Sequence, residues 1–123
     1  MEQKHILLVE DDAIVTESIV YTLEKAGYSV GHTISGKLGV ETALKSRPDL
    51  IIADLLLPDM NGAEMIAQIR NDPWGKNAKI IVLTNLDDAQ IKAKLLSLSV
   101  LRYLLKVDNT LTRITQIIDE ILK

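Results

Sequence analysis

The sequence lacks several residue types, and each absence narrows what the chain can be. It has no cysteine, which excludes disulfide bonds and thiolate metal ligands and fits a reducing compartment. It has no phenylalanine, one tryptophan and three tyrosines, so the core must be built from Ile, Leu and Val. Basic residues are not in excess, because 14 Lys and Arg against 17 Asp and Glu give a net charge of −3. That balance argues against direct binding of nucleic acid.

Long apolar segments are also missing. No apolar run approaches the ~20 residues that cross a bilayer, and residues 1–5 lack the apolar core of a signal peptide. We therefore expect a cytoplasmic protein without membrane contact. With 123 residues, the chain is expected to form one domain over residues 1–123, with no effector domain.

Apolar segments of two kinds alternate along the chain. Short apolar runs predict buried strands at residues 6–9, 49–53 and 79–84. Residues 28–34 alternate loosely and predict a strand nearer the sheet edge, and residues 101–106 predict a fifth strand. Apolar residues spaced three or four apart predict a helix after each strand, most clearly from Leu111 to Leu122. The fold class is therefore expected to be α/β. The pattern favours a (βα)5 flavodoxin-like, doubly wound parallel sheet with strand order 2-1-3-4-5.

The segment Asp54–Gly62 follows the third expected strand. Asp54 lies at the carboxyl end of that strand, Pro58 prevents the strand from continuing, and Asn61-Gly62 indicates a turn. Open α/β sheets place their chemistry at the carboxyl ends of strands, so Asp54 is a candidate functional carboxylate. Taken alone, an equally good interpretation is that Asp54 only caps the turn.

Polar residues also follow the first, fourth and fifth expected strands. They are Glu10, Asp11 and Asp12, then Thr84, then Lys106. In a parallel sheet these ends share one edge, so the side chains should converge with Asp54. Clustered carboxylates repel one another, and Mg²⁺, which prefers oxygen ligands, relieves the repulsion. Lys106 and Thr84 can hold phosphoryl oxygens while Asp54 accepts the phosphoryl group as a nucleophile.

Each of these residues also has a plainer structural role open to it. The acidic run 10–12 can cap the next helix, Thr84 can be ordinary strand material, and Lys106 can be an exposed lysine. Each plain role is favoured or even when the residue is taken singly. The joint occurrence at four strand ends favours a phosphoryl-transfer site.

With these residues in view, the whole chain resembles the receiver domain of two-component response regulators. Residues 6–12 resemble the opening strand and acidic pair of that family, and Asp54–Gly62 is similar to its phosphoacceptor motif. Residues 80–84 and 103–106 match two later landmarks. The resemblance implies that Asp54 is the phosphoacceptor and that Thr84 and Lys106 contact the phosphoryl group.

The resemblance further implies a switch residue and a metal site. Tyr103 would be the aromatic residue that turns inward as Thr84 moves. The implied Mg²⁺ ligands are Asp11 directly, Glu10 through water, Asp54, and the backbone carbonyl of Leu56. Asp12 lies just outside the acidic pair in this register.

The function implied by the resemblance is a phosphorylated switch, and not an enzyme that turns over a separate substrate. The donor would be a phosphohistidine on a sensor histidine kinase or a phosphotransfer protein. Phosphorylation would shift the fourth helix and fifth strand between two packings, which a downstream protein partner reads. Leucines on that face also allow a weak homodimer.

Four positions depart from the family pattern. Val107 follows Lys106 where the family usually has proline with a cis peptide, and Asn85 follows Thr84 where a smaller residue is common. Leu56 and Leu86 are apolar where many members are polar, so we expect slow loss of the phosphoryl group to water.

Two alternatives share the fold. A degenerate receiver, acting as a phosphorylation-independent scaffold, would require the Val107 loop to misplace Lys106. A flavodoxin would require a phosphate-cradling loop after the first strand, where this chain has Glu10-Asp11-Asp12. Those acids would repel a phosphate, so the flavodoxin alternative is disfavoured.

Overall fold

The computed structural model describes residues 2–123, and its elements follow the alternation expected from the sequence. The strands are β1 (His5–Val9), β2 (Ser29–Thr33), β3 (Leu50–Ala53), β4 (Ile80–Thr84) and β5 (Arg102–Leu105). The α-helices are α1 (Ala13–Lys25), α2 (Gly36–Ser46), α3 (Gly62–Arg70), α4 (Ala89–Ser97) and α5 (Leu111–Leu122). Two short 3₁₀ helices, η1 (Gly75–Asn77) and η2 (Lys106–Asp108), precede β4 and α5.

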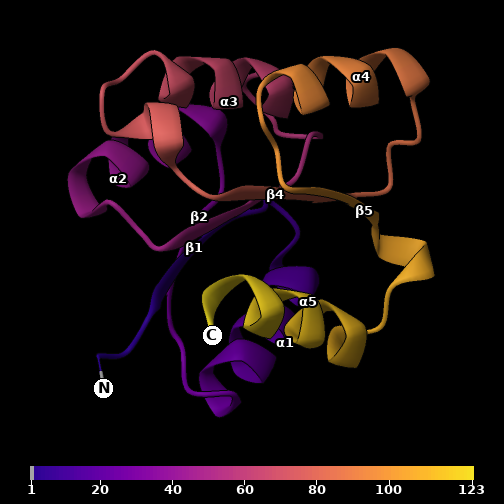
Figure 1. The fold of residues 1–123 in the computed structure, drawn as a ribbon. Coiled ribbons are helices and arrows are strands. Elements are labelled where there is room, and N and C mark those ends of the chain that lie inside the picture. Colours follow the sequence, from indigo (N-terminus) through magenta and orange to yellow (C-terminus); the bar gives the residue numbers. More distant parts are fainter. Residues whose placement is uncertain (1) are drawn as a thin grey trace.

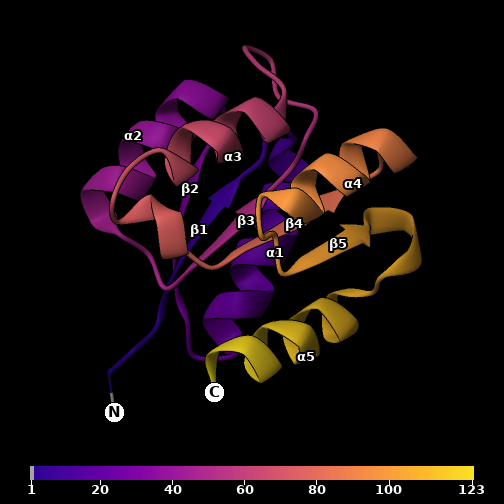
Figure 2. The same cartoon turned by 45° about the horizontal axis from the view of Figure 1, so that its top comes forward.

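The strands form one parallel sheet in the order β2-β1-β3-β4-β5 (Figures 1 and 2). This order and the parallel pairing confirm the predicted fold class. The predicted strand bounds are correct to within one residue at each end. One difference concerns the site. The sequence predicted Lys106 as the last residue of the fifth strand, but β5 ends at Leu105 and Lys106 begins η2.

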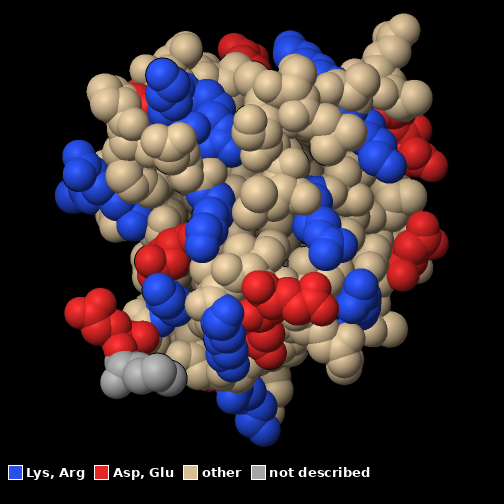
Figure 3. All heavy atoms as spheres, in the orientation of Figure 1, with Lys and Arg blue, Asp and Glu red and all other residues tan. Residues whose placement is uncertain are grey.

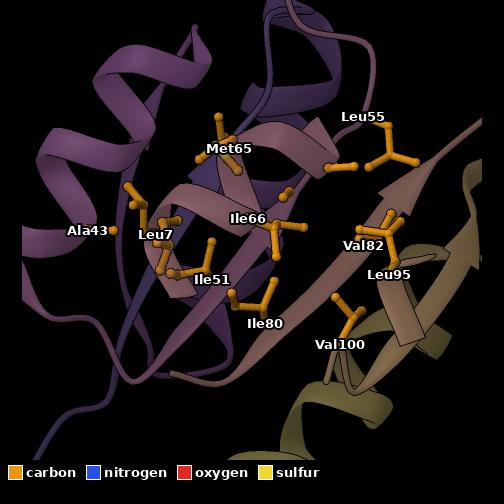
Figure 4. Packing of buried hydrophobic residues seen from close by; sticks show 14 residues of the cluster. Leu7, Ala43, Ile51, Leu55, Met65, Ile66, Ile80, Val82, Leu95 and Val100 are labelled. Atoms are coloured by element: carbon orange, nitrogen blue, oxygen red, sulfur yellow. The ribbon is translucent and has the colours of Figure 1, made fainter. Parts of the chain in front are cut away.

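The sheet separates two apolar clusters. Helices α2, α3 and α4 cover one face, and α1 and α5 cover the other (Figure 1). Side chains alternate along each strand, so Ile51 packs under α3 with Ile66, as Figure 4 shows, whereas Ile52 joins the cluster that contains Ile117 of α5. Burial on both faces explains why the central strands are continuously apolar in the sequence.

Helix starts are capped by polar side chains. Asp12 is the N-cap of α1, and its Oδ1 accepts the N–H groups of Ile14 at 2.9 Å and Val15 at 3.0 Å. Asp88 caps α4 in the same way, with Oδ1 accepting from Gln90 and Ile91. The capping role that was open for the acidic run is therefore taken by its last member, which leaves the two acids before it for another role.

No helix within residues 2–123 has both the length and the apolar character that a bilayer crossing requires. On the face drawn in Figure 3, basic and acidic side chains are intermixed.

Candidate functional site

Three carboxylates meet at the carboxyl edge of the sheet. Glu10 follows β1 and Asp54 follows β3, and both are buried, with 2% and 5% of their surfaces exposed. Asp11 lies beside them and is exposed. One oxygen from each of the three acids lies within 4.8 Å of the others. The convergence expected from the strand ends is thus present in the fold.

Lys106 reaches into this cluster from the end of β5. Its Nζ donates to Asp54 Oδ2 at 2.8 Å and also to Glu10 Oε1. The side chain is 19% exposed, so Lys106 is not a solvated surface lysine. The peptide between Lys106 and Val107 is trans, since residues 2–123 contain no cis peptide. Replacing the expected proline by Val107 therefore has not moved Lys106 away from Asp54.

The pKa values of the two buried acids are shifted in opposite directions. Burial raises the pKa of Glu10 from 4.5 to about 7, although Lys106 opposes the shift. Burial would also raise the pKa of Asp54, but hydrogen bonds, led by the one from Lys106, hold it below 3.8. The same contacts raise the pKa of Lys106, despite the opposing effect of burial. At neutral pH the site therefore holds an ionised Asp54 against a charged lysine.

The turn after β3 fixes the direction of Asp54. Its Oδ1 accepts the backbone N–H of Leu56 at 3.2 Å, so the simple turn-capping role is present alongside the ion pair. Asn61 caps α3 by accepting the Ala63 N–H at 2.7 Å. A Cβ at Gly62 would lie 2.4 Å from the Asp54 carbonyl oxygen, so only glycine allows α3 to start this close to the strand.

Thr84 and Tyr103 are connected through the backbone of one residue, Leu86. Thr84 is fully buried at the end of β4; its hydroxyl helps to lower the pKa of Asp54 and accepts the Leu86 N–H at 3.3 Å. Tyr103, half-buried on β5, donates its hydroxyl to the carbonyl of Leu86. Lys92 of α4 lies 5.7 Å from the centre of the Tyr103 ring. A movement of Thr84 can therefore reach α4 and β5 through a short chain of contacts.

One contributor to the site was not anticipated. Asn109 donates from Nδ2 to the carbonyl of Leu105, the residue before Lys106, at 2.8 Å. An asparagine in a turn carries no signal that identifies this contact, because its partner is a backbone atom four residues earlier.

The donor set suits Mg²⁺. The three acids offer carboxylate oxygens, which are the hard ligands that Mg²⁺ prefers, and the cluster is open to solvent on the side of Asp11. Lys106 supplies one positive charge to buried acids that would otherwise repel each other. The part assigned to the Leu56 carbonyl stays a prediction.

Comparison with known proteins agrees with this geometry. The model of the response regulator receiver domain family matches residues 6–119. The chain belongs to this family. Membership of this family connects this receiver domain, with its strand-end carboxylates and Lys106, to two-component signalling.

Individual relatives show how far the similarity extends. The probable transcriptional regulatory protein SilR of Salmonella typhimurium is 37% identical over 101 residues, which cover 82% of this receiver domain and 43% of SilR. The chemotaxis protein CheY of Thermotoga maritima is 38% identical over 64% of the chain and 65% of CheY. The chain spans half of the Staphylococcus saprophyticus response regulator ArlR. The chain therefore spans half or less of SilR and ArlR.

Solved structures agree over nearly the whole length. The chemotaxis response regulator CheY4 of Vibrio cholerae superposes with a TM-score of 0.89 at 25% identity, covering 98% of this chain and 100% of CheY4. A putative response regulator from Chloroflexus aurantiacus gives a TM-score of 0.88 at 29% identity, covering 98% of both chains. The receiver fold is thus shared with proteins of low sequence identity.

Proposed function

We propose that this receiver domain accepts a phosphoryl group on Asp54 and works as a switch in a two-component phosphorelay. The donor is a phosphohistidine on a sensor histidine kinase or a phosphotransfer protein, and a downstream protein partner reads the result. The observation that supports this proposal is the Asp54 carboxylate, held at a strand end between Lys106 and the acids Glu10 and Asp11.

The proposed chemistry is an in-line displacement at phosphorus. A carboxylate oxygen of Asp54 forms the new P–O bond while the P–N bond to the donor imidazole breaks. The low pKa of Asp54 keeps the nucleophile ionised at neutral pH. When bound by Glu10, Asp11 and Asp54, Mg²⁺ supplies charge neutralisation for the phosphoryl oxygens.

Lys106 and Thr84 complete the proposed phosphoryl site. The ammonium of Lys106, already 2.8 Å from Asp54 Oδ2, moves its hydrogen bond to a phosphoryl oxygen. The hydroxyl of Thr84 gives up the Leu86 N–H and donates to another phosphoryl oxygen. Tyr103, which is bonded to the carbonyl of Leu86, follows that change. The face formed by α4 and β5 is then the surface that the partner reads.

Other expectations for the chain belong to this same proposal. The chain acts in the cytoplasm and catalyses only its own phosphorylation and dephosphorylation. It contacts its partners by protein–protein binding, without direct binding of nucleic acid.

The experiment that tests the proposal is intact mass after incubation with Mg²⁺ and acetyl phosphate. We expect the native chain to gain one phosphoryl group and Asp54→Asn to gain none. Asp12→Asn is the matched control, because Asp12 is a neighbouring acid outside the cluster and asparagine retains its capping oxygen. A chelator such as EDTA should abolish the gain in all variants.

Small donors do not serve every receiver, so a second donor decides a negative result. If neither acetyl phosphate nor a phosphohistidine protein adds mass to the native chain, the proposal is wrong. The phosphorylation-independent scaffold would then be the better description of this domain.

A further inference from the structure

Both peptide groups that flank Lys106 are held by asparagine side chains. The N–H of Val107 donates to Asn85 Oδ1 at 3.1 Å. The carbonyl of Leu105 accepts from Asn109 Nδ2 at 2.8 Å. Asn85 follows β4 and Asn109 follows η2, so the two side chains approach Lys106 from different segments of the chain.

The two asparagines use opposite ends of their amide groups. Val107 offers a backbone donor, so Asn85 must present its oxygen. Leu105 offers a backbone acceptor, so Asn109 must present its nitrogen. The contacts therefore differ in a way that a single isosteric substitution, Asn→Asp, distinguishes, since aspartate retains the acceptor and loses the donor.

Little else fixes the backbone at this point. Strand β5 ends at Leu105, so the sheet no longer restrains Lys106. Val107 is 76% exposed and belongs to neither apolar cluster. Within η2, the Asn109 N–H to Lys106 carbonyl contact is long, at 3.4 Å. A lysine on a flexible stem needs a fixed backbone to keep its ammonium on a given oxygen.

We propose that Asn85 and Asn109 form a clamp that positions the Lys106 ammonium over Asp54. Both are positioning residues, because neither is shown to contact Asp54 and both act through the backbone of Lys106. The clamp also relates two departures of this chain to each other. Proline at position 107 would have no N–H for Asn85, so Asn85 and Val107 form a matched pair.

The effect of the clamp on phosphorylation rests on the proposed function, whereas its effect on Lys106 does not. The first experiment therefore measures the acylation rate of Lys106 in metal-free protein by peptide mass spectrometry, with the exposed Lys45 of α2 as the internal reference. A lysine paired with Asp54 and Glu10 reacts slowly. Asn109→Asp should raise the rate about three- to tenfold, the factor expected for one lost hydrogen bond.

Asn85→Asp is the matched control. It adds the same charge near Lys106 but retains the acceptor for Val107, so the rate should stay within about twofold of the native chain. Asn85→Leu, which is similar in size but has no acceptor, should raise the rate as Asn109→Asp does. This third variant supplies the test if Asn109→Asp fails to fold. Equal rates in the two aspartate variants, or no increase in either Asn109→Asp or Asn85→Leu, would overturn the proposal.

The second experiment measures the initial rate of phosphorylation by acetyl phosphate. Asn109→Asp should slow it about three- to tenfold in the native background and have no further effect in a Lys106→Ala background. A purely structural role would slow both backgrounds alike and would overturn the clamp. Should the native chain take no phosphoryl group from acetyl phosphate or from a phosphohistidine protein, the proposed function fails, and the Lys106 acylation rates alone decide the clamp.

Discussion

At the level of single residues, the acids at the strand ends outnumber the positive charges beside them. Two buried carboxylates, Glu10 and Asp54, share one ammonium from Lys106, and a third acid, Asp11, lies beside them. Lys106 stabilises ionised Asp54, whereas burial raises the pKa of Glu10 and so disfavours its ionised form. Without a cation the arrangement costs stability at neutral pH, which is a common property of sites built for function.

Glu10 makes that cost measurable. Because its pKa is raised from 4.5 to about 7, the folded chain binds this proton more tightly than the unfolded chain does. Stability is therefore lost as pH rises from about 4.5 to about 7. Glu10→Gln cannot ionise, so in EDTA it should exceed the native chain in free energy of unfolding by about 1–3 kcal/mol at pH 8. The gain should largely disappear near pH 4.5.

Urea denaturation at both pH values checks this prediction. The matched control is Glu17→Gln, an exposed glutamate on α1, which should show no such pH dependence. A Glu10→Gln variant that is less stable than the native chain at pH 8 would show that ionised Glu10 stabilises the fold.

Leu56 is the residue expected to limit water at the phosphoryl site. Of the two leucines singled out in the sequence, Leu86 is half-buried against the core, whereas Leu56 is 55% exposed and adjoins Asp54. We expect an aspartyl-phosphate half-life of minutes or longer, and Leu56→Asn should shorten it about three- to tenfold by admitting water. Loss of the phosphoryl mass with time is the measurement.

Leu101→Asn is the control for this change. Leu101 is 47% exposed and precedes β5, at the amino-terminal ends of the strands and away from Asp54, so its substitution should leave the half-life unchanged. A native half-life of seconds would contradict the expectation.

At the level of elements, Arg70 joins the end of α3 to two neighbouring turns. Its guanidinium donates to the carbonyls of Leu98 at 2.8 Å, Gly75 at 2.8 Å, Ala78 at 2.6 Å and Ser99 at 3.2 Å. These carbonyls lie at the end of α4 and around η1, and of the four, that of Gly75 also accepts the Ala78 N–H. Arg70 thus anchors the carboxyl end of α4, the helix expected to respond to phosphorylation.

Removing this anchor should destabilise the fold. Arg70→Met removes the guanidinium donors from all four carbonyls and should lower the free energy of unfolding by about 2–4 kcal/mol. Arg70→Lys should recover less than half of the loss, because an ammonium does not reproduce the planar fork of five donors. Urea denaturation measures both, with exposed Arg113→Met of α5 as the control. A loss no larger than that of Arg113→Met would refute the anchor.

For the molecule as a whole, the sheet divides the core into two separate clusters. Ile66 of α3 and Ile117 of α5 are almost completely buried, but they belong to clusters on opposite faces. Ile→Val at each position should cost about 0.5–1.5 kcal/mol of unfolding free energy. The double variant should cost the sum within ~0.5 kcal/mol, as measured by urea denaturation. A larger deviation would mean that the two clusters are coupled through the sheet.

The fold was predictable from local pattern. Period and apolar content identified every strand and α-helix, but not the 3₁₀ helices η1 and η2. A strand buried on both faces must be continuously apolar, and a surface helix must carry one apolar stripe. Parallel strands joined by helices then allow few orders, and the observed one was expected. The positions of Asp54, Thr84 and Glu10 at one edge follow from the same rule, since each ends or follows a strand.

Contacts between distant segments were not predictable in this way. In the acidic run 10–12, Glu10 and Asp11 join the acidic cluster and Asp12 caps α1, because α1 begins after Asp12. The sequence does not reveal this division, since it predicts the start of a helix only to within a residue or two. Lys106 faces Asp54 as predicted, whereas Asn109 reaches Leu105 only because η2 turns the chain back after β5. Period and composition determine which element a residue joins; the partner of a given polar atom depends on turns whose geometry is set by packing of the assembled elements.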